Sequence, residues 1–158
     1  MYNIKCKVIK LSTLLSSEEG ERQFRELVKY QWLEVDHRRK TSALDIDFNK
    51  YLKLEEAGFH YMVVAFSDKE LVGYNSMFAS PSPHTGELTA LTDTIFIKKE
   101  YRKGGLGSTM IKLAEEEAKT RGCAHIMVTF KNDQPHPEIV KELGFFSYET
   151  IYSKYIGG

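Results

Sequence analysis

Residues 92–108, which read TDTIFIKKEYRKGGLGS, decide the fold of this chain. The first six of these residues are mostly β-branched or aromatic and form the end of an expected strand at residues 88–97. A glycine-rich turn follows, and a helix is expected to begin there. Glycines allow a ligand to come close to the backbone, and the first N–H groups of a helix have no partner within it. Together with the helix dipole and the Arg102 side chain, this arrangement predicts a site for a phosphate or pyrophosphate group.

Two familiar phosphate motifs do not match this turn. A nucleotide P-loop needs Lys followed by Ser or Thr after its last glycine, and no such pair follows Gly107. The dinucleotide-binding fingerprint belongs to repeated parallel βαβ units, which the sequence lacks. The alternative to an anion site is a plain strand-to-helix turn, because short glycine motifs also arise by chance.

The pattern outside this stretch mixes strands and helices along the chain. Strands are expected at residues 4–11, 61–66, 71–78, 88–97, 125–130 and 145–156. Helices are expected from Ser16 or Ser17 to Val35, over residues 44–54 before Gly58, from the glycine turn to Gly122, and from Pro137 to Gly144. This order predicts an α/β or α+β protein with helices on both faces of one sheet.

The composition is that of one globular domain over residues 1–158. The chain weighs 18.2 kDa, 42% of its residues are hydrophobic, and 22 basic residues balance 22 acidic ones. Zero net charge argues against wrapping nucleic acid or an anionic membrane through bulk charge. No stretch approaches the ~20 apolar residues of a membrane span, and no signal peptide is expected. Cys6 and Cys123 are too few for a disulfide scaffold, and the five histidines lack ligand spacing, so a cytoplasmic protein without a metal is expected.

The glycine turn also carries a family resemblance. Residues 102–107, RKGGLG, fit the R-x-x-G-x-G/A signature of the GNAT N-acetyltransferase superfamily in the same strand–turn–helix context. Residues 132–145 look like the second conserved segment of that superfamily. Further stretches, at residues 51–58, 71–74, 144–149 and 152–154, resemble the small GNAT proteins carried by bacteriophages. The resemblance extends from about Trp32 onward.

The resemblance implies the GNAT fold, in which a central mixed, largely antiparallel twisted sheet of six to seven strands has helices on both faces. It also implies acetyl-CoA as cosubstrate. The residues assigned to its pyrophosphate are Arg102, Lys103, Gly104, Gly105, Leu106, Gly107 and Ser108, with Asn132 from the second segment. The pantetheine arm is expected to pair with the backbone of Ile95, Phe96 and Ile97, and an N–H near Ile97 would hold the thioester oxygen.

Asp93 is the candidate general base for transfer to an amine. The residue lies four positions before Ile97, so strand alternation predicts that both share one face and point toward the reacting centre. GNAT enzymes often carry an acidic residue at this place. The alternative is a carboxylate that only orders the strand or caps a neighbouring helix.

The proton donor for the leaving thiolate does not follow the pattern of the superfamily. Its usual Tyr, four residues before the glycine of the Gly-Phe pair, is replaced here by Val140. His136 matches a His of the phage-type relatives and is assigned to the role, with Tyr148 and Tyr152 as further candidates. The alternatives are a helix-start His bonded to backbone, and aromatic residues that belong to the core.

The amine acceptor, a small molecule or a protein, is expected to lie near Glu34, Arg38 and His84. The alternative for each of them is a solvated surface residue without a role in binding, because charged turns and loop histidines are usually exposed to solvent. Two other functions stay open on the same fold: an acyl-CoA-binding or regulatory module with little activity, and a host-interaction protein. The aromatic last strand, at residues 145–156, predicts a homodimer through strand pairing.

Overall fold

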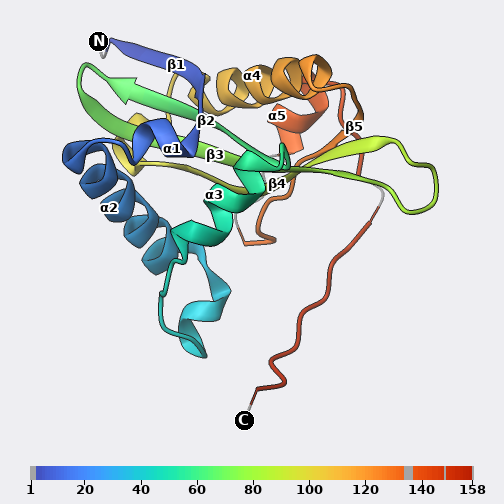
Figure 1. The fold of residues 1–158 in the computed structure, drawn as a ribbon, viewed down its shortest axis with the longest axis horizontal. Helices are drawn as coiled ribbons and strands as arrows, with labels where there is room; N and C mark the ends of the chain where they lie inside the picture. Colours follow the sequence, from blue (N-terminus) through green and yellow to red (C-terminus); the bar gives the residue numbers. More distant parts are fainter. Residues whose placement is uncertain (1–2, 134–136, 148, 158) are drawn as a thin grey trace.

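The computed structural model describes residues 3–133, 137–147 and 149–157. A five-stranded sheet in the order β1-β2-β3-β4-β5 forms its centre (Figure 1). The strands are β1 (Ile4–Ile9), β2 (His60–Ser67), β3 (Glu70–Pro81), β4 (Leu88–Ile97) and β5 (Cys123–Met127). Neighbours are antiparallel up to β4, whereas β4 and β5 are parallel. The sheet is therefore mixed and largely antiparallel, as predicted.

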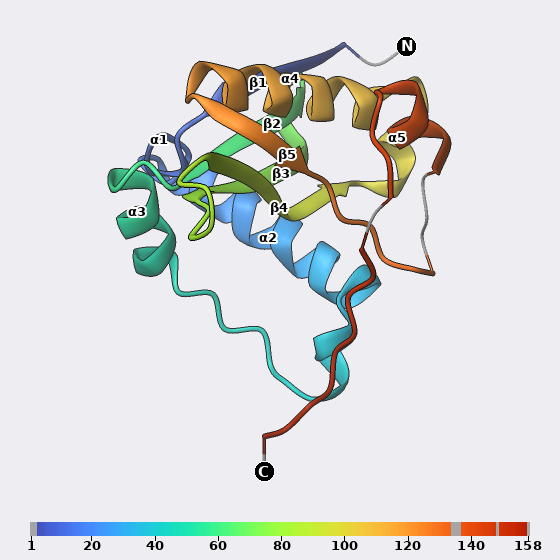
Figure 2. The same ribbon diagram turned by 90° about the vertical axis from the view of Figure 1, so that its right-hand side faces the viewer.

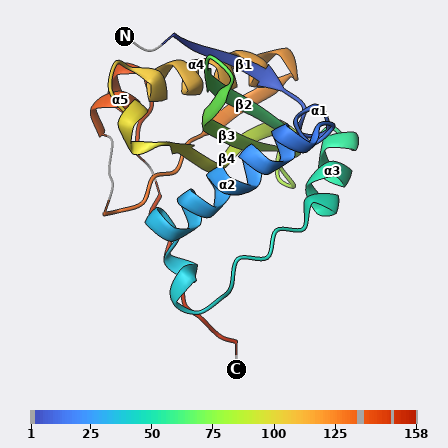
Figure 3. The ribbon, with the colours of Figure 1, turned by 90° about the vertical axis from the view of Figure 1, so that its left-hand side faces the viewer.

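Helices cover both faces of the sheet, which confirms the predicted layers (Figures 1 and 3). The helical segments are α1 (Leu11–Leu14), α2 (Glu18–Val35), η1 (His37–Lys40), α3 (Phe48–Glu56), η2 (Lys99–Tyr101), α4 (Leu106–Thr120) and α5 (Pro137–Glu142). The first three α-helices pack on one face and α4 on the other. The start of α2 follows the expected signal, because Ser17 accepts a hydrogen bond from the Gly20 N–H at 3.1 Å.

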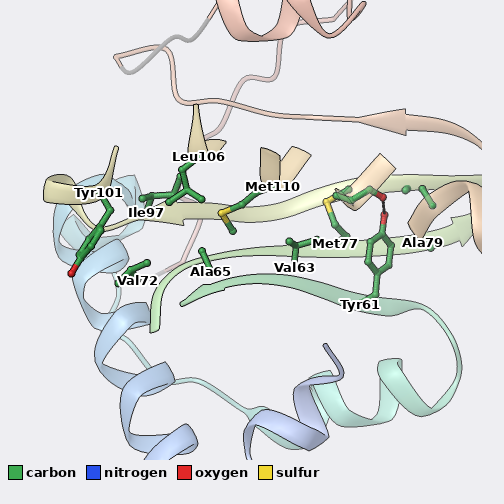
Figure 4. Close-up of a cluster of buried hydrophobic side chains, with 13 residues drawn as sticks. Tyr61, Val63, Ala65, Val72, Met77, Ala79, Ile97, Tyr101, Leu106 and Met110 are labelled. Carbon is green, nitrogen blue, oxygen red and sulfur yellow. Dashed lines mark hydrogen bonds between the residues drawn. The ribbon is translucent and has the colours of Figure 1, made fainter. Parts of the chain in front are cut away.

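Each face has its own buried core. The core under α4 joins β-strand residues such as Val63 to Met110 of the helix, and the Tyr61 hydroxyl donates to the Ala114 carbonyl at 2.9 Å (Figure 4). The opposite core joins Leu27 of α2 to Tyr74 of β3. Because both faces are covered, β2 and β3 are buried along nearly their whole length.

A β-bulge interrupts β4 and reverses one expectation. Ser76 of β3 lies opposite Thr94, but its neighbour Met77 lies opposite Thr92, so Asp93 is an extra residue on β4. The Thr92 hydroxyl donates to the Met77 sulfur in the α4-side core, whereas Asp93 contacts Ser76 on the other face. Ile97 belongs to the α4-side core. The prediction that Asp93 and Ile97 share a face is therefore wrong, because one inserted residue breaks the strict alternation.

The predicted sixth strand is not formed in the part of the tail that the structure describes. Residues 145–147 and 149–157 carry no helix or strand, and their side chains are largely exposed. The segment runs away from the sheet, past η1 (Figures 1 and 2). A strand-prone sequence makes a strand only when a sheet edge supplies its hydrogen bonds, and this segment has no such pairing. The described sheet has five strands instead of six to seven.

Candidate functional site

The glycine turn presents an open, uncapped helix start. Gly104 and Gly105 have φ of 82° and 78°, a region that side-chain-bearing residues rarely adopt. Gly105 is the N-cap of α4, and no side chain caps that helix. Apart from each glycine and its chain neighbours, no heavy atom of the described residues lies within 4 Å of the position that a Cβ would take at Gly104 or Gly105. The first N–H groups of α4 can therefore be approached closely by an anion.

Arg102 is held between β4 and α2 at the edge of this turn. Its Nε donates to the Ile97 carbonyl at 2.8 Å, and its guanidinium lies 2.6 Å from a Glu34 carboxylate oxygen. The same group lies 5.3 Å from the centre of the Phe96 ring. The structure thus places Glu34, predicted to border the acceptor, against the predicted pyrophosphate-binding Arg102.

The last part of β4 has one side without a strand partner. Pairing with β5 covers only residues 88–91 of β4, while pairing with β3 continues to Ile97. Lys98 N–H donates to the Val72 carbonyl at 2.9 Å, so alternation directs the backbone groups of Phe96 to β3. Those of Ile95 and Ile97 point to the open side. Of the three residues predicted to pair with pantetheine, these two present their backbone there, although the Ile97 carbonyl already accepts from Arg102.

The Asp93 carboxylate lies in a small polar cluster on the face opposite α4. Its Oδ2 accepts hydrogen bonds from the Tyr51 hydroxyl at 3.0 Å and the Ser76 hydroxyl at 3.2 Å. The Asp93 residue is exposed overall, but the atoms packed around its carboxylate partly desolvate it, and this desolvation raises the pKa of Asp93 more than the two hydrogen bonds and the positive charge of Arg38 lower it. A carboxyl group with a raised pKa is a better proton acceptor than an ordinary surface aspartate.

Arg38 is fixed beside this cluster by a buried partner. Asp36 is 2% exposed and accepts from Arg38 Nε at 2.9 Å and from its terminal nitrogen at 2.6 Å. Burial disfavours the Asp36 charge, but the hydrogen bonds from Arg38 prevail and lower the pKa of Asp36 to about 2. The cation of Arg38 is thereby held close enough to Asp93 to act on its charge.

The other predicted site residues are dispersed or lie outside the described parts of the chain. His84 is exposed in the loop between β3 and β4, at the end of β4 far from the glycine turn. Tyr152 is 91% exposed in the tail. Asn132 lies in an exposed turn after β5. His136 and Tyr148 fall outside the described residues.

The remaining cofactor assignments differ in what they can offer. The Leu106 side chain belongs to the α4-side core, so only its backbone faces the turn. Lys103 is exposed and Ser108 half-buried. A Cβ on Gly107 would meet only Ile97 Cδ1, at 3.9 Å, which is ordinary contact.

Several residues of the site gave no signal in the sequence. The sequence pattern placed Tyr51 on the apolar side of a helix and Ser76 in a strand, and it placed His60 just before a strand, with no metal-ligand spacing. Asn75 is fully buried opposite Ile95 of β4, and neither of its amide atoms has a hydrogen-bond partner in the part of the chain that the structure describes. Such a group is rare in folded proteins. Only long-range packing brings these side chains to β4.

Comparisons with known proteins bear on this geometry. The sequence profile of the Acetyltransferase (GNAT) family matches residues 22–145, most of the chain. The chain belongs to the GNAT acetyltransferase family. A comparison with curated proteins gives no match.

Solved structures agree with the GNAT fold. An aminoglycoside acetyltransferase from an uncultured soil metagenomic sample, in complex with sisomicin, superposes with a TM-score of 0.74 at 13% identity, covering 98% of this chain and 95% of that one. Glucosamine-6-phosphate N-acetyltransferase from Arabidopsis thaliana gives 0.72 at 15% identity, with 98% and 99% covered. Ribosomal-protein-alanine N-acetyltransferase from Brucella melitensis gives 0.66 at 15% identity, with 97% and 99% covered. At these identities the likeness shows the fold alone.

Membership of the GNAT family implies acetyl-CoA as the acetyl donor, and the residues of this GNAT domain fit that molecule. The open turn at Gly104 and Gly105 suits a pyrophosphate, because uncapped helix N–H groups attract anions. The open side of β4 at Ile95 and Ile97 suits the two amides of pantetheine. When bound, acetyl-CoA would supply the acetyl thioester.

Two further findings apply to the described residues of this GNAT domain. No group of three or more His, Cys, Asp or Glu side chains there is arranged to hold a metal ion. Within the same residues, none of the helices has the length and hydropathy that crossing a bilayer would require.

Proposed function

We propose that this protein transfers an acetyl group from acetyl-CoA to a primary amine by direct transfer in a ternary complex. The observation that carries the proposal is the position of Asp93. A carboxylate with a raised pKa projects from the bulge of β4, the strand whose next residues have an open backbone side and lead into the glycine turn. The proposed proton acceptor, Asp93, and the backbone proposed to bind the thioester thus both belong to β4.

In the proposed reaction the neutral amine nitrogen attacks the thioester carbonyl, and the carbon–sulfur bond breaks. Asp93 takes the proton that the amine loses, directly or through water. A backbone N–H on the open side of β4, at Ile97, stabilises the negative oxygen that develops on the carbonyl. The acceptor approaches Asp93 from the face that carries Arg38, so a second cation beside Arg38 is disfavoured and the amine binds neutral.

The leaving thiolate needs a proton, and the proposed donors are His136 and Tyr152. Val140 stands where the superfamily has its usual Tyr. Because Tyr152 is 91% exposed, it serves as donor only if substrate binding draws the tail toward β4. His136 lies outside the described residues, and its proposed role rests on the sequence resemblance.

The acceptor class is proposed as a small-molecule or protein amine. The structurally similar proteins named above are an aminoglycoside, a glucosamine-6-phosphate and a ribosomal-protein-alanine acetyltransferase. Those names describe those proteins, and the spread from sugars to a protein terminus leaves both kinds of amine within the proposal. Glu34, Arg38 and His84 stay the proposed acceptor-side residues.

A second candidate function is a coenzyme-binding, regulatory or host-interaction module with little catalysis. The exposed Tyr152 and the apolar Val140 favour it, because neither supplies the buried proton donor that the superfamily uses. Such a module would keep the glycine turn and bind acetyl-CoA without turning it over.

One set of measurements separates the two candidates. Thiol release from acetyl-CoA is followed with a panel of amines, and labelled acetyl-CoA is incubated with cell extract before mass spectrometry of the labelled product. Amine-dependent release supports the acetyltransferase. Thermal stabilisation by millimolar acetyl-CoA without release supports the binding module. If acetyl-CoA gives neither thermal stabilisation nor thiol release, the acetyltransferase and the coenzyme-binding module are both refuted, and a host-interaction protein that has lost the coenzyme is favoured.

We also propose that the protein forms a homodimer through its tail, and that it acts in the cytoplasm, in an infected bacterial host if its origin is a phage. Phe146, Ile151, Tyr152 and Ile156 are each at least 74% exposed, and β5 is an edge strand. A strand-prone segment and an open edge can pair between two copies. Sedimentation at tens of micromolar should show a dimer, and a monomer at that concentration would refute the association.

A further inference from the structure

The Asp93 carboxylate is the end of a hydrogen-bonded chain that reaches through the sheet face to β2. Asp93 Oδ2 lies 3.2 Å from the Ser76 hydroxyl, and Ser76 Oγ lies 2.9 Å from His60 Nε2. His60 is 1% exposed and Ser76 is 3% exposed. Three strands therefore contribute one residue each, since β2, β3 and β4 are neighbours in the sheet.

When Asp93 is ionised, the two hydrogen bonds that link His60, Ser76 and Asp93 can be arranged with only one assignment of donors and acceptors. A carboxylate only accepts, so Ser76 must use its single proton on Asp93. Ser76 Oγ can then only accept from His60, which assigns the proton of the neutral imidazole to Nε2. The other ring nitrogen, Nδ1, is buried without a partner in the described structure. This agrees with the assigned tautomer, in which Nδ1 carries no proton and therefore has no hydrogen bond to donate. We assign the tautomer from this network.

His60 serves as a neutral donor and not as a proton carrier. Burial is the main reason that the pKa of His60 falls to about 4, with Glu55 raising it and Arg121 lowering it further. At pH 7 only about one ring in a thousand is then protonated. A relay through an imidazolium would be rare, whereas a fixed Nε2–H is present almost all the time.

Packing holds the imidazole in place. The His60 ring meets Tyr51 edge-on at 5.3 Å and Phe78 at 5.6 Å, and Tyr51 stacks on Phe78 at 5.9 Å. Tyr51 is also the second donor to Asp93. Tyr51 therefore both packs against the His60 ring and donates a hydrogen bond to Asp93.

We propose that Ser76 and His60 are positioning residues for Asp93: the His60 Nε2–H fixes the Ser76 hydroxyl as a donor to Asp93 Oδ2. This inference rests on the proposed function only for its catalytic consequence, because the orientation of Asp93 is a property of the protein alone. The hydroxyl of Ser76 would otherwise rotate among several acceptors, and the carboxylate would lose a donor that favours its charged form.

The consequence is a defined protonation behaviour of Asp93. The groups that face its carboxylate are Tyr51 from α3, Ser76 from β3, Asp36 between α2 and η1, and Arg38 from η1. Desolvation and Asp36 raise the pKa, whereas Tyr51, Ser76 and Arg38 lower it. Removing the Ser76 donor must therefore raise the pKa of Asp93, and releasing the Ser76 hydroxyl by loss of His60 must raise it by less.

The test measures the pKa of Asp93 directly, by carbon-13 NMR of its carboxyl group, with the signal assigned from Asp93→Asn. Ser76→Ala removes the donor, His60→Leu removes its support, and His60→Gln restores an amide N–H near the position of Nε2. Ser80→Ala, an exposed serine on the same strand, is the matched control. The pH profile of kcat/KM is recorded for each variant with any amine that supports thiol release, and melting curves establish that each is folded.

We expect the Asp93 pKa to rise by about one pH unit in Ser76→Ala, since a hydrogen bond to a charged group has about that effect. His60→Leu should give a smaller rise, His60→Gln should return toward the wild-type value, and Ser80→Ala should change nothing. An unchanged Asp93 pKa in folded Ser76→Ala would overturn the proposal, and failure of His60→Gln to rescue would remove His60 from it. If the carboxyl pKa shifts while the acidic limb of the rate profile does not, the positioning stands and the role of Asp93 as base fails.

Discussion

The glycine turn and the Asp93 bulge lie at two ends of one continuous segment, yet they are built differently. At the turn, Gly104 and Gly105 supply the backbone conformation themselves, and among the described residues no atom beyond their chain neighbours lies within 4 Å of the position that a Cβ would take. At the bulge, the protonation of Asp93 depends on side chains from α3, from β3 and from the α2–η1 junction. The conformation of the glycine turn can thus be inferred from the sequence alone, whereas the protonation of the Asp93 carboxylate depends on partners that are distant along the chain.

The largest effect is expected at the bulge. Asp93→Asn should lower kcat/KM about 10²–10⁴-fold, the usual contribution of a general base. Because desolvation raises the pKa of Asp93 above its ordinary 3.8, and a base must be deprotonated, wild-type activity should fall as the pH drops through that raised value. The variant should lose this acidic limb and keep its affinity for acetyl-CoA.

Asp68→Asn is the matched control for this comparison. Asp68 lies in the turn between β2 and β3 with φ of 52°, a conformation that Asn also tolerates. The Asp68→Asn variant should have the kcat/KM and the pH profile of the wild type. Full activity of folded Asp93→Asn would assign catalysis to positioning and to the backbone of β4 alone.

The next effect concerns the cation beside the glycine turn. Arg102→Ala should weaken acetyl-CoA binding by about 1–3 kcal/mol, roughly 5- to 150-fold, because a charge-assisted hydrogen bond to a phosphate is lost. Glu34→Gln should act in the opposite direction, by a few-fold, because it frees Arg102 from its ion pair at 2.6 Å. Titration calorimetry with acetyl-CoA measures both. Equal affinity of Arg102→Ala and wild type would place the pyrophosphate away from Arg102.

The glycine turn itself offers a matched pair of variants. Gly105→Ala and Gly122→Ala both place a side chain at positive φ, 78° and 81°, with nothing within 4 Å, at the two ends of α4. Each should cost about 1 kcal/mol of stability, lowering Tm by about 2–4 °C. Only Gly105→Ala should also weaken acetyl-CoA binding, because only that methyl group stands where the ligand approaches. Equal coenzyme affinity in the two variants would contradict the anion site.

The smallest effect is expected behind β4, at Asn75. Its side chain is fully buried and neither amide atom has a partner among the described residues, so the free energy of unfolding should increase when an apolar side chain of similar size replaces it. Asn75→Leu should raise Tm by about 2–4 °C, corresponding to about 1 kcal/mol. A lower Tm in a calorimetric scan would show that the amide is satisfied in solution.

Much of the fold follows from local patterns. Strand β4 has the predicted bounds, and β2, β3 and the Ser17 cap of α2 lie where the sequence indicates them. The short helix α1 was missed, because four residues do not reveal a helical period. Helix α3 begins at Phe48, later than predicted, because the Asp47 side chain caps it by accepting from the Lys50 N–H at 3.3 Å.

In the candidate site, too, some features could be predicted from the sequence and others could not. The strand–turn–helix geometry of the glycine turn could be predicted, since it depends on residue types at fixed spacing; the role of Asp93 stays a proposal. The face on which Asp93 lies could not be predicted, because a bulge depends on the register of β3 against β4. The fate of residues 145–156 could not either, because their aromatic and β-branched composition is equally compatible with a strand and with an exposed tail.

The sequence by itself determined the mixed sheet with helices on both faces, the open helix start at Gly105 and the family of the chain. These depend on periodicity and on backbone conformations that one or two residues impose. Only the tertiary structure decided that Arg102 pairs with Glu34, and that Tyr51, Ser76 and His60 surround and support Asp93. The physical reason is distance along the chain: a hydrogen bond between residues of different strands exists only after the sheet has set their register and packing has removed the water between them.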